Sequence, residues 1–231
     1  MENTFPGGLK ARAESRTDGT SVTWLPDGRT ITARTAPDPR FGMAAEYVSE
    51  STTVTPGGLT STRSMARSAL LADPNDPSTL QSLTEMQTLN GRVSAAAYDA
   101  ATRTWTRTSA AGRVATTVLD SAGRVVRSEQ PLVLPVQMAY DEHGRLASST
   151  QGARTHLFAY DPATGYLRGV TDPMSQSVLY DRDSIGRTTR QTMPGGDVID
   201  FGYDAAGNMT LLTPPGKPSH AMTYTPVNLL Q

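Results

Sequence analysis

The sequence contains no cysteine, so its 231 residues form neither disulfides nor thiolate metal sites. This absence leaves the compartment open, because exported proteins can also lack cysteine. Apolar residues make up 37% of the chain and charged residues 19%, both below the usual share in globular domains. We therefore expect a thin hydrophobic core spread over much surface.

The sequence also lacks an excess of basic charge. It has 21 Lys and Arg against 22 Asp and Glu, with the signs interspersed, so the basic stripe that binds phosphates is missing and nucleic acid is not an expected partner. No apolar run approaches the roughly 20 residues of a membrane span. The first residues, up to Gly8, contain neither a basic nor an apolar segment, so we expect any export signal to lie outside this chain.

Known catalytic motifs are missing as well. The sequence has no Gly-x-Ser-x-Gly and no phosphate-cradling Gly-x-x-x-x-Gly-Lys. His143, His156 and His220 have no metal-ligand spacing and are interpreted as solvated or packing side chains. We therefore predict no catalytic, cofactor-binding or metal-ligating residues, no cofactor and no enzymatic activity. Trp24 and Trp105 are the candidates for a sugar-binding platform.

Turn-forming residues are abundant instead. Thr, Ser, Gly and Pro fill the places of the missing apolar and charged residues, and apolar residues at helical spacing are rare. This composition favours many short strands joined by many turns. The fold class that we predict is all-β.

A period of about 21 residues runs through the second half of the chain. Aspartate recurs at intervals of 20 to 22 residues, and Thr225 stands at the next place in phase. A tyrosine precedes five of these seven positions, while Leu119 and Arg182 precede the other two. The aspartates are Asp99, Asp120, Asp141, Asp161, Asp183 and Asp204, and the tyrosines are Tyr98, Tyr140, Tyr160, Tyr203 and Tyr224.

Glycine follows most of these aspartates at a fixed offset. It comes three residues later at Gly123, Gly144, Gly186 and Gly207, and one residue later still at Gly165. An Asp in the first position of a turn accepts a backbone N–H, and a Gly in the fourth position takes a positive φ. Asp-x-x-Gly is therefore predicted to be a hairpin turn. A second turn signal follows about ten residues later, so each unit reads as strand, turn, strand, turn.

These units predict an antiparallel meander of hairpins that forms a curved ribbon. The tyrosines would then stand at the same edge of successive hairpins and form a ladder, each ring packing on the neighbouring unit. Because the periodic aspartates share one environment and supply one carboxylate per turn, a structural role is favoured over catalytic carboxylate pairs or calcium sites.

The first part of the chain has turns without the strict period. Residues 1–97 are interpreted as an irregular β lead-in and residues 98–231 as the repeat region. Ser78 to Met86 is ambiguous, because Leu80, Leu83 and Met86 are three residues apart, as on a helix. The hairpin signal Asn90-Gly91 that follows favours a strand.

Residues 98–231 resemble the YD-repeat or Rhs family, related to Tc-type toxin shells and teneurins. The resemblance rests on three segments, which are Ala139-Tyr140-Asp141-Glu142-His143-Gly144-Arg145-Leu146, Phe201-Gly202-Tyr203-Asp204-Ala205-Ala206-Gly207-Asn208 and Tyr224-Thr225-Pro226-Val227-Asn228-Leu229. It implies that the repeats wind a β-ribbon into a large hollow shell, which encloses a toxic C-terminal domain in bacterial members and serves cell adhesion in teneurins. Bacterial members also carry a self-cleavage segment, but Asp161-Pro162 lies in phase with the repeat and is interpreted as an ordinary turn.

The resemblance predicts a segment of such a shell. Its partners would be other YD repeats of the same parent chain and an enclosed toxin polypeptide, and its location would be secreted or at the cell surface. The alternative is a surface module that binds a glycan or a protein through an open sheet face or edge. We expect the chain to be a fragment, and we expect its unpaired strand edges to make it marginal or self-associating alone.

Overall fold

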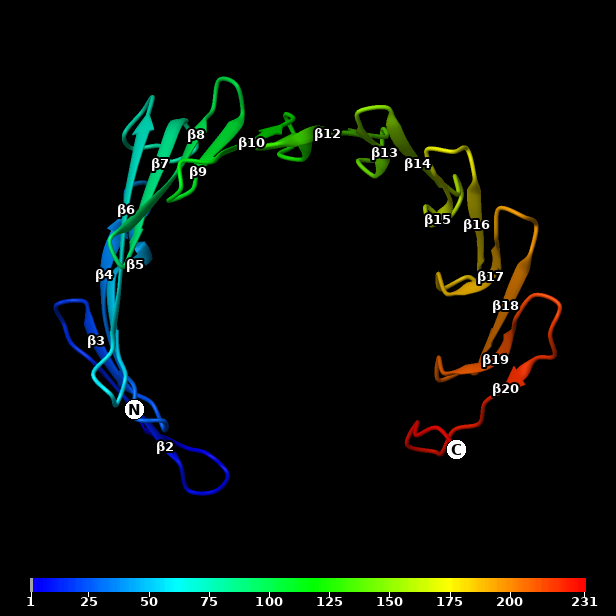
Figure 1. Ribbon diagram of the computed structural model, residues 1–231, viewed down its shortest axis with the longest axis horizontal. Coiled ribbons are helices and arrows are strands. Elements are labelled where there is room, and N and C mark those ends of the chain that lie inside the picture. Colours follow the sequence, from blue (N-terminus) through cyan, green and yellow to red (C-terminus); the bar gives the residue numbers. More distant parts are fainter. Residues whose placement is uncertain (1) are drawn as a thin grey trace. The chain divides into compact units, whose positions relative to one another are not determined.

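The computed structural model describes residues 2–231, and this part of the chain folds into strands joined by turns, with no helix (Figure 1). Each hairpin joins consecutive strands, so the all-β class predicted from composition is confirmed. The twenty strands are β1 (Glu2–Thr4), β2 (Lys10–Ser15), β3 (Thr20–Trp24), β4 (Thr30–Asp38), β5 (Gly42–Val54), β6 (Thr60–Leu71), β7 (Leu80–Leu89), β8 (Arg92–Asp99), β9 (Thr104–Thr108), β10 (Val114–Leu119), β11 (Val125–Gln130), β12 (Val133–Tyr140), β13 (Leu146–Gln151), β14 (Arg154–Tyr160), β15 (Leu167–Thr171), β16 (Ser177–Arg182), β17 (Thr188–Thr192), β18 (Val198–Tyr203), β19 (Met209–Thr213) and β20 (His220–Ala221).

The chain divides into two compact units, of which one ends at Val133 and the other spans Leu134–Gln231. In the first unit the strands from β1 to β11 each pair antiparallel with the next strand in sequence. In the second unit the strands from β12 to β20 do the same. The predicted meander is therefore confirmed within each unit. The proposed boundary between lead-in and repeats, after residue 97, stays a prediction.

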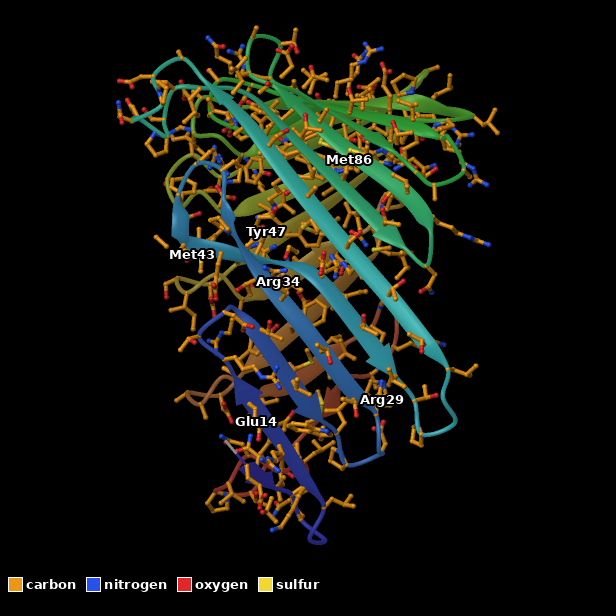
Figure 2. All side chains as sticks on the ribbon, turned by 90° about the vertical axis from the view of Figure 1, so that its left-hand side faces the viewer. Glu14, Arg29, Arg34, Met43, Tyr47 and Met86 are labelled. Atoms are coloured by element: carbon orange, nitrogen blue, oxygen red, sulfur yellow. The ribbon has the colours of Figure 1, made fainter. Side chains whose placement is uncertain are left out.

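The first unit contains the longest strands. β5 has 13 residues and β6 has 12, against five to eight residues for most strands of the second unit. The ambiguous segment Ser78 to Met86 enters strand β7, so the strand interpretation is confirmed. Figure 2 shows these long strands side by side, with Arg34 and Tyr47 on the β4–β5 hairpin and Met86 on β7.

β5 and β6 pair only over part of their length. Their register runs from Val54↔Thr60 to Glu50↔Ser64, beyond which the two strands diverge near Tyr47 (Figure 2). On the far side, β6 continues to pair with β7 as far as Leu71. The backbone ladder between β5 and β6 is therefore replaced by side-chain contacts at this fork.

The second unit is built from short hairpins that turn steadily in one sense (Figure 1). In four of its hairpins the register shifts by one residue immediately before the turn, which is the signature of a β-bulge. The shifts lie at Ala139/Tyr140, Ala159/Tyr160, Asp181/Arg182 and Gly202/Tyr203.

Each unit is a single sheet layer, so little of the chain is buried. The solvent-accessible surface is 15259 Å², whereas a compact monomer of 24.6 kDa would expose roughly 10,000 Å². Among the described hydrophobic residues only Leu83, 7% exposed, is buried. The thin core expected from the composition thus contains one buried apolar side chain among the described residues.

None of the described residues lies in a helix long and apolar enough to cross a membrane.

Candidate functional site: the turns and tyrosines of the repeats

The Asp-x-x-Gly motif forms a hairpin turn that is closed by both its backbone and its aspartate. Asp120 Oδ1 accepts the backbone N–H groups of Ala122 (2.9 Å) and Arg124 (3.0 Å). Gly123 donates its N–H to the Asp120 carbonyl at 3.1 Å and has a φ of 78°, in the left-handed region. The same capping bond recurs from the residue after each glycine, at Arg145 to Asp141, Arg187 to Asp183 and Asn208 to Asp204.

Three copies depart from this pattern in sequence but still form turns. The Asp161 loop is one residue longer, and its carboxylate caps Ala163 and Thr164 before Gly165 closes the turn. Where glycine is missing, another residue takes the positive φ. Arg103 does so in the Asp99 loop (51°), and Asn228 does so in the Thr225 loop (60°).

The tyrosines that precede the turns bond to the preceding repeat. The hydroxyl of Tyr160 donates to the Leu146 carbonyl at 3.0 Å, and the hydroxyl of Tyr203 donates to the Thr188 carbonyl at the same distance. Tyr224 reaches the Met209 carbonyl at 2.9 Å. In each case the acceptor lies two residues after the turn glycine of the preceding repeat. At Tyr160 and Tyr203 a bulge immediately before the turn accompanies this bond.

The two other tyrosines of the period are half-buried as well. The Tyr140 hydroxyl lies 4.0 Å from the Met138 sulfur. The Tyr98 ring packs on Trp105, with ring centroids 5.2 Å apart. Trp105 also has the guanidinium of Arg107 over its ring, at 5.3 Å from the centroid.

At two turns of the second unit, an arginine after the turn glycine connects the turn to the next repeat. Arg145 Nε donates to Asp141 Oδ2 at 2.7 Å, while its Cζ lies 4.4 Å from the centroid of the Tyr160 ring. Arg145 Nη1 also donates to the carbonyl of Gly165 in the next turn, at 3.3 Å. The geometry combines an ion pair, a cation–π contact and a bond between turns.

Arg187 repeats these contacts two repeats later. It donates to Asp183 at 2.6 Å, lies 4.7 Å from the Tyr203 ring centroid and donates to the Asp204 carbonyl at 3.2 Å. In the second unit we call the turn aspartates, Arg145, Arg187 and the tyrosines at this edge of the sheet the inter-repeat spine. Its aspartates and tyrosines are among the repeat residues named from the sequence, and Arg145 and Arg187 are added by the structure.

These hydrogen bonds lower the pKa values of the turn aspartates. The backbone N–H and the guanidinium of Arg124 lower the pKa of Asp120. The N–H of Thr164 lowers the pKa of Asp161, and the side-chain amide of Asn208 lowers the pKa of Asp204. Each carboxylate is thus already engaged. In the described residues no group of three His, Cys, Asp or Glu side chains is placed to hold a metal ion.

The turns at Asp172 and Met193, at the opposite edge of the second unit, are each closed by hydrogen bonds among their own residues. Asp172 caps Met174 and Gln176 at 2.8 Å each, and Gly196 donates to the Met193 carbonyl at 2.9 Å. No hydrogen bond joins these two turns in the described part of the chain. A hollow of about 670 Å³ lies between them, lined by Gln176, Met193 and their neighbours.

A charged cluster at the fork of β5 and β6 was not found from the sequence. Asp38 is only 5% exposed, and its Oδ2 lies 3.4 Å from Arg67 Nη1. Arg67 also lies 2.7 Å from Glu85 Oε1 through its Nε and stacks over Tyr47 at 4.7 Å. The backbone N–H of Arg67 donates to the Tyr47 hydroxyl at 3.2 Å. Because a buried charge needs a partner, Asp38 is paired with Arg67. The contacts between Arg67 and Tyr47 join β6 to β5 beyond the point where the backbone pairing of these strands ends.

The remaining residues singled out from the sequence lie apart. His143, His156 and His220 are exposed, in a turn, on β14 and on β20. Trp24 is 37% exposed on β3, with the guanidinium of Arg12 over its ring at 5.2 Å.

The comparisons agree with this architecture. The family model described as Teneurin YD-shell matches residues 3–230. The solved structure of the Photorhabdus luminescens Tc holotoxin pore is 12% identical with a TM-score of 0.50, and the match covers 96% of this chain but 14% of that chain. No curated protein matches the sequence.

Two further solved structures are less similar in fold. A crystal structure of TcdB2-TccC3 is 14% identical with a TM-score of 0.39, over 96% of this chain and 13% of that one. TcdB2-TccC3 without its hypervariable C-terminal region is 14% identical with a TM-score of 0.40, over 96% and 12%. The chain therefore spans a small part of the length of these structures. With the family model matched along nearly all of its length, the chain belongs to the Teneurin YD-shell family.

Proposed function

We propose that this chain forms one stretch of the wall of a hollow protein shell, and that the shell encloses a toxin or effector polypeptide. The observation that supports this most is the YD-shell match over residues 3–230 of a chain folded as single-layer sheet. A layer with no second layer on it has the architecture of a wall. In this role the chain contributes no catalytic groups.

The neighbours of the chain along the wall would be other YD repeats of the same parent polypeptide. The spine supplies the means, because its arginines donate hydrogen bonds to backbone carbonyls of the next repeat and its tyrosines donate to carbonyls of the preceding repeat. We propose that the sixteen repeat residues predicted from the sequence serve this structural role. A shell with a toxic content would act outside the producing cell, so we propose a secreted or surface location.

The test uses the parent polypeptide that contains this chain. Limited proteolysis measures how fast trypsin digests the segment that we propose to be enclosed. Electron microscopy of the same sample shows whether the particle is closed. We expect this segment to resist trypsin in the parent polypeptide and to be digested quickly when it is expressed alone. Equal digestion rates in the two forms, or an open ribbon in the micrographs, would contradict enclosure.

A matched pair of glycine variants sharpens this test. Gly186 has a φ of 88°, and a Cβ there would lie 2.9 Å from the Tyr166 ring, so Gly186→Ala should loosen the wall and speed digestion of the enclosed segment. The φ of Gly195 lies outside the left-handed region, and a Cβ added there would have no atom within 4 Å. Gly195→Ala should therefore leave digestion unchanged.

A further inference from the structure

Two junctions between repeats of the second unit use one arginine and one tyrosine in a fixed order, and we call them regular. The arginine follows the turn glycine of one repeat, and the tyrosine precedes the turn aspartate of the next. Arg145 with Tyr160 and Arg187 with Tyr203 follow this order, with guanidinium-to-ring distances of 4.4 and 4.7 Å. The tyrosine hydroxyl then donates to the carbonyl of the residue after the arginine.

The junction between these two has the same residue types in the opposite order. Tyr166 follows the turn glycine Gly165, at the place that arginine occupies elsewhere. Arg182 precedes the turn aspartate Asp183, at the place of the tyrosine. Neither position keeps the usual residue, yet the pair keeps the usual composition.

The exchanged residues make equivalent contacts. Arg182 Nε donates to the Leu167 carbonyl at 3.0 Å, and Leu167 is the residue that follows Tyr166. This acceptor corresponds to Leu146 and Thr188, which receive the tyrosine hydroxyls in the regular junctions. The Tyr166 ring, in turn, packs on the next turn, so closely that a Cβ on Gly186 would lie 2.9 Å from the ring.

The Arg182 guanidinium also bonds within its own turn, in addition to the bond that crosses the junction to Leu167. Its Nη1 donates to the Gly186 carbonyl at 2.8 Å and lies 3.3 Å from Thr188 Oγ1. One cation and one phenol ring thus occupy this junction in either order, and in the exchanged order the arginine makes the hydrogen bond to the preceding repeat. Two arginines would place like charges together, and two tyrosines would remove the cation that bonds the turn carbonyls.

We infer that Tyr166 and Arg182 are a matched pair that determines which repeat can follow which. A repeat that ends its turn in arginine accepts a neighbour with tyrosine before its aspartate, and a repeat that ends in tyrosine accepts a neighbour with arginine. The repeats are therefore not interchangeable along the ribbon. This inference concerns the order of repeats and does not depend on what a shell encloses.

The test exchanges the two residues singly and together in the full chain. Tyr166→Arg and Arg182→Tyr each create a mismatched junction. Each should lower the melting midpoint by about 2–4 °C, as expected when one stabilising contact is lost from a chain of this size. The double variant restores the regular order and should recover most of the loss. Losses that add in the double variant, or single variants that melt like the parent, would overturn the inference.

A composition control separates pairing from charge. Arg154 is exposed at the start of β14, outside the junction, so Tyr166→Arg with Arg154→Tyr keeps the amino-acid composition while leaving two arginines at the junction. This variant should stay destabilised. Its recovery to the parent midpoint would contradict the pairing rule.

Hydrogen–deuterium exchange provides a local measurement. The mismatched single variants should exchange faster in the turn at residues 183–187 than in the turn at residues 120–124, and the double variant should return to the slow rate. If the single variants fail to fold, a folded double variant supports the rule and an unfolded double variant overturns it.

Discussion

Single residues explain why the turns could be predicted. Asp at the first position and Gly at the fourth have local conformational preferences that act within five residues, so Asp120 and Gly123 could be placed in a turn from the sequence. The cation over the tyrosine could not be foreseen. Arg145 and Tyr160 meet only because the meander brings positions 15 residues apart together.

The positive φ of the turn glycines can be tested where no side chain interferes. A Cβ on Gly123 would have no atom within 4 Å, so Gly123→Ala isolates the cost of its φ of 78°. We expect a loss of about 1–2 kcal/mol in the free energy of unfolding, measured by urea denaturation. Gly195→Ala, at a backbone conformation open to alanine, should show no such loss. Equal effects of the two variants would refute the conformational role.

The lowered pKa values of the turn aspartates predict acid sensitivity. The backbone N–H of Thr102 lowers the pKa of Asp99, as that of Arg124 lowers the pKa of Asp120. Because the folded-state pKa lies below the unfolded value of about 3.9, the stabilisation is complete above that value and is lost as the pH falls through the folded pKa. Circular dichroism melts should therefore show a midpoint that drops as the pH is lowered below about 4.

Asp99→Asn is the control for this pH dependence. In the parent chain, Asp99 accepts the backbone N–H of Thr102 at 2.9 Å. Asparagine keeps an oxygen that can accept this bond, but it does not titrate in this pH range. The variant should lose less stability on acidification than the parent chain. An identical pH profile would show that this carboxylate does not contribute.

Among the elements, strand β7 shows how tertiary contacts settle an ambiguous pattern. The spacing of Leu80, Leu83 and Met86 fits a helix as well as a strand, but pairing with both β6 and β8 selects the strand. Its type followed from the hairpin signal at Asn90-Gly91. The fork between β5 and β6 did not, because Asp38 and Arg67 are 29 residues apart and neither has a local pattern.

Leu83 carries the packing of this element. It is the one buried apolar side chain among the described residues, opposite Ala69 on β6 and Tyr98 on β8. Leu83→Ala should lower the free energy of unfolding by about 2–4 kcal/mol, measured by urea denaturation. Leu70→Ala, at a position 57% exposed on β6, should cost less than about 0.5 kcal/mol. Similar losses at both positions would argue against a core at Leu83.

For the whole molecule, the fold class and the family could be inferred because the repeat period is written in the sequence. The accessible surface of 15259 Å² adds what the period does not show, namely how little the chain buries. Repeats that contact only their neighbours gain stability by adding neighbours, not by thickening a core.

The exposed surface predicts self-association of the isolated chain. Large apolar side chains such as Leu157 and Leu179 are 50% and 47% exposed, and open sheet invites further contacts. Size-exclusion chromatography with light scattering should give a mass that rises with concentration. A constant monomer mass at high concentration, with a cooperative melt, would show that the single layer is stable alone.

The unequal edges of the second unit have a consequence for how such a protein can change in evolution. The edge with the spine fixes the spacing of successive hairpins, because Arg145 and Arg187 each bond the following turn. The turns near Asp172 and Met193 have no such bond and are separated by open space. Insertions should therefore be tolerated at these two turns without changing the spacing between successive hairpins. New loops can then arise at one edge of the second unit while the bonds of the spine keep the hairpins in place at the other edge.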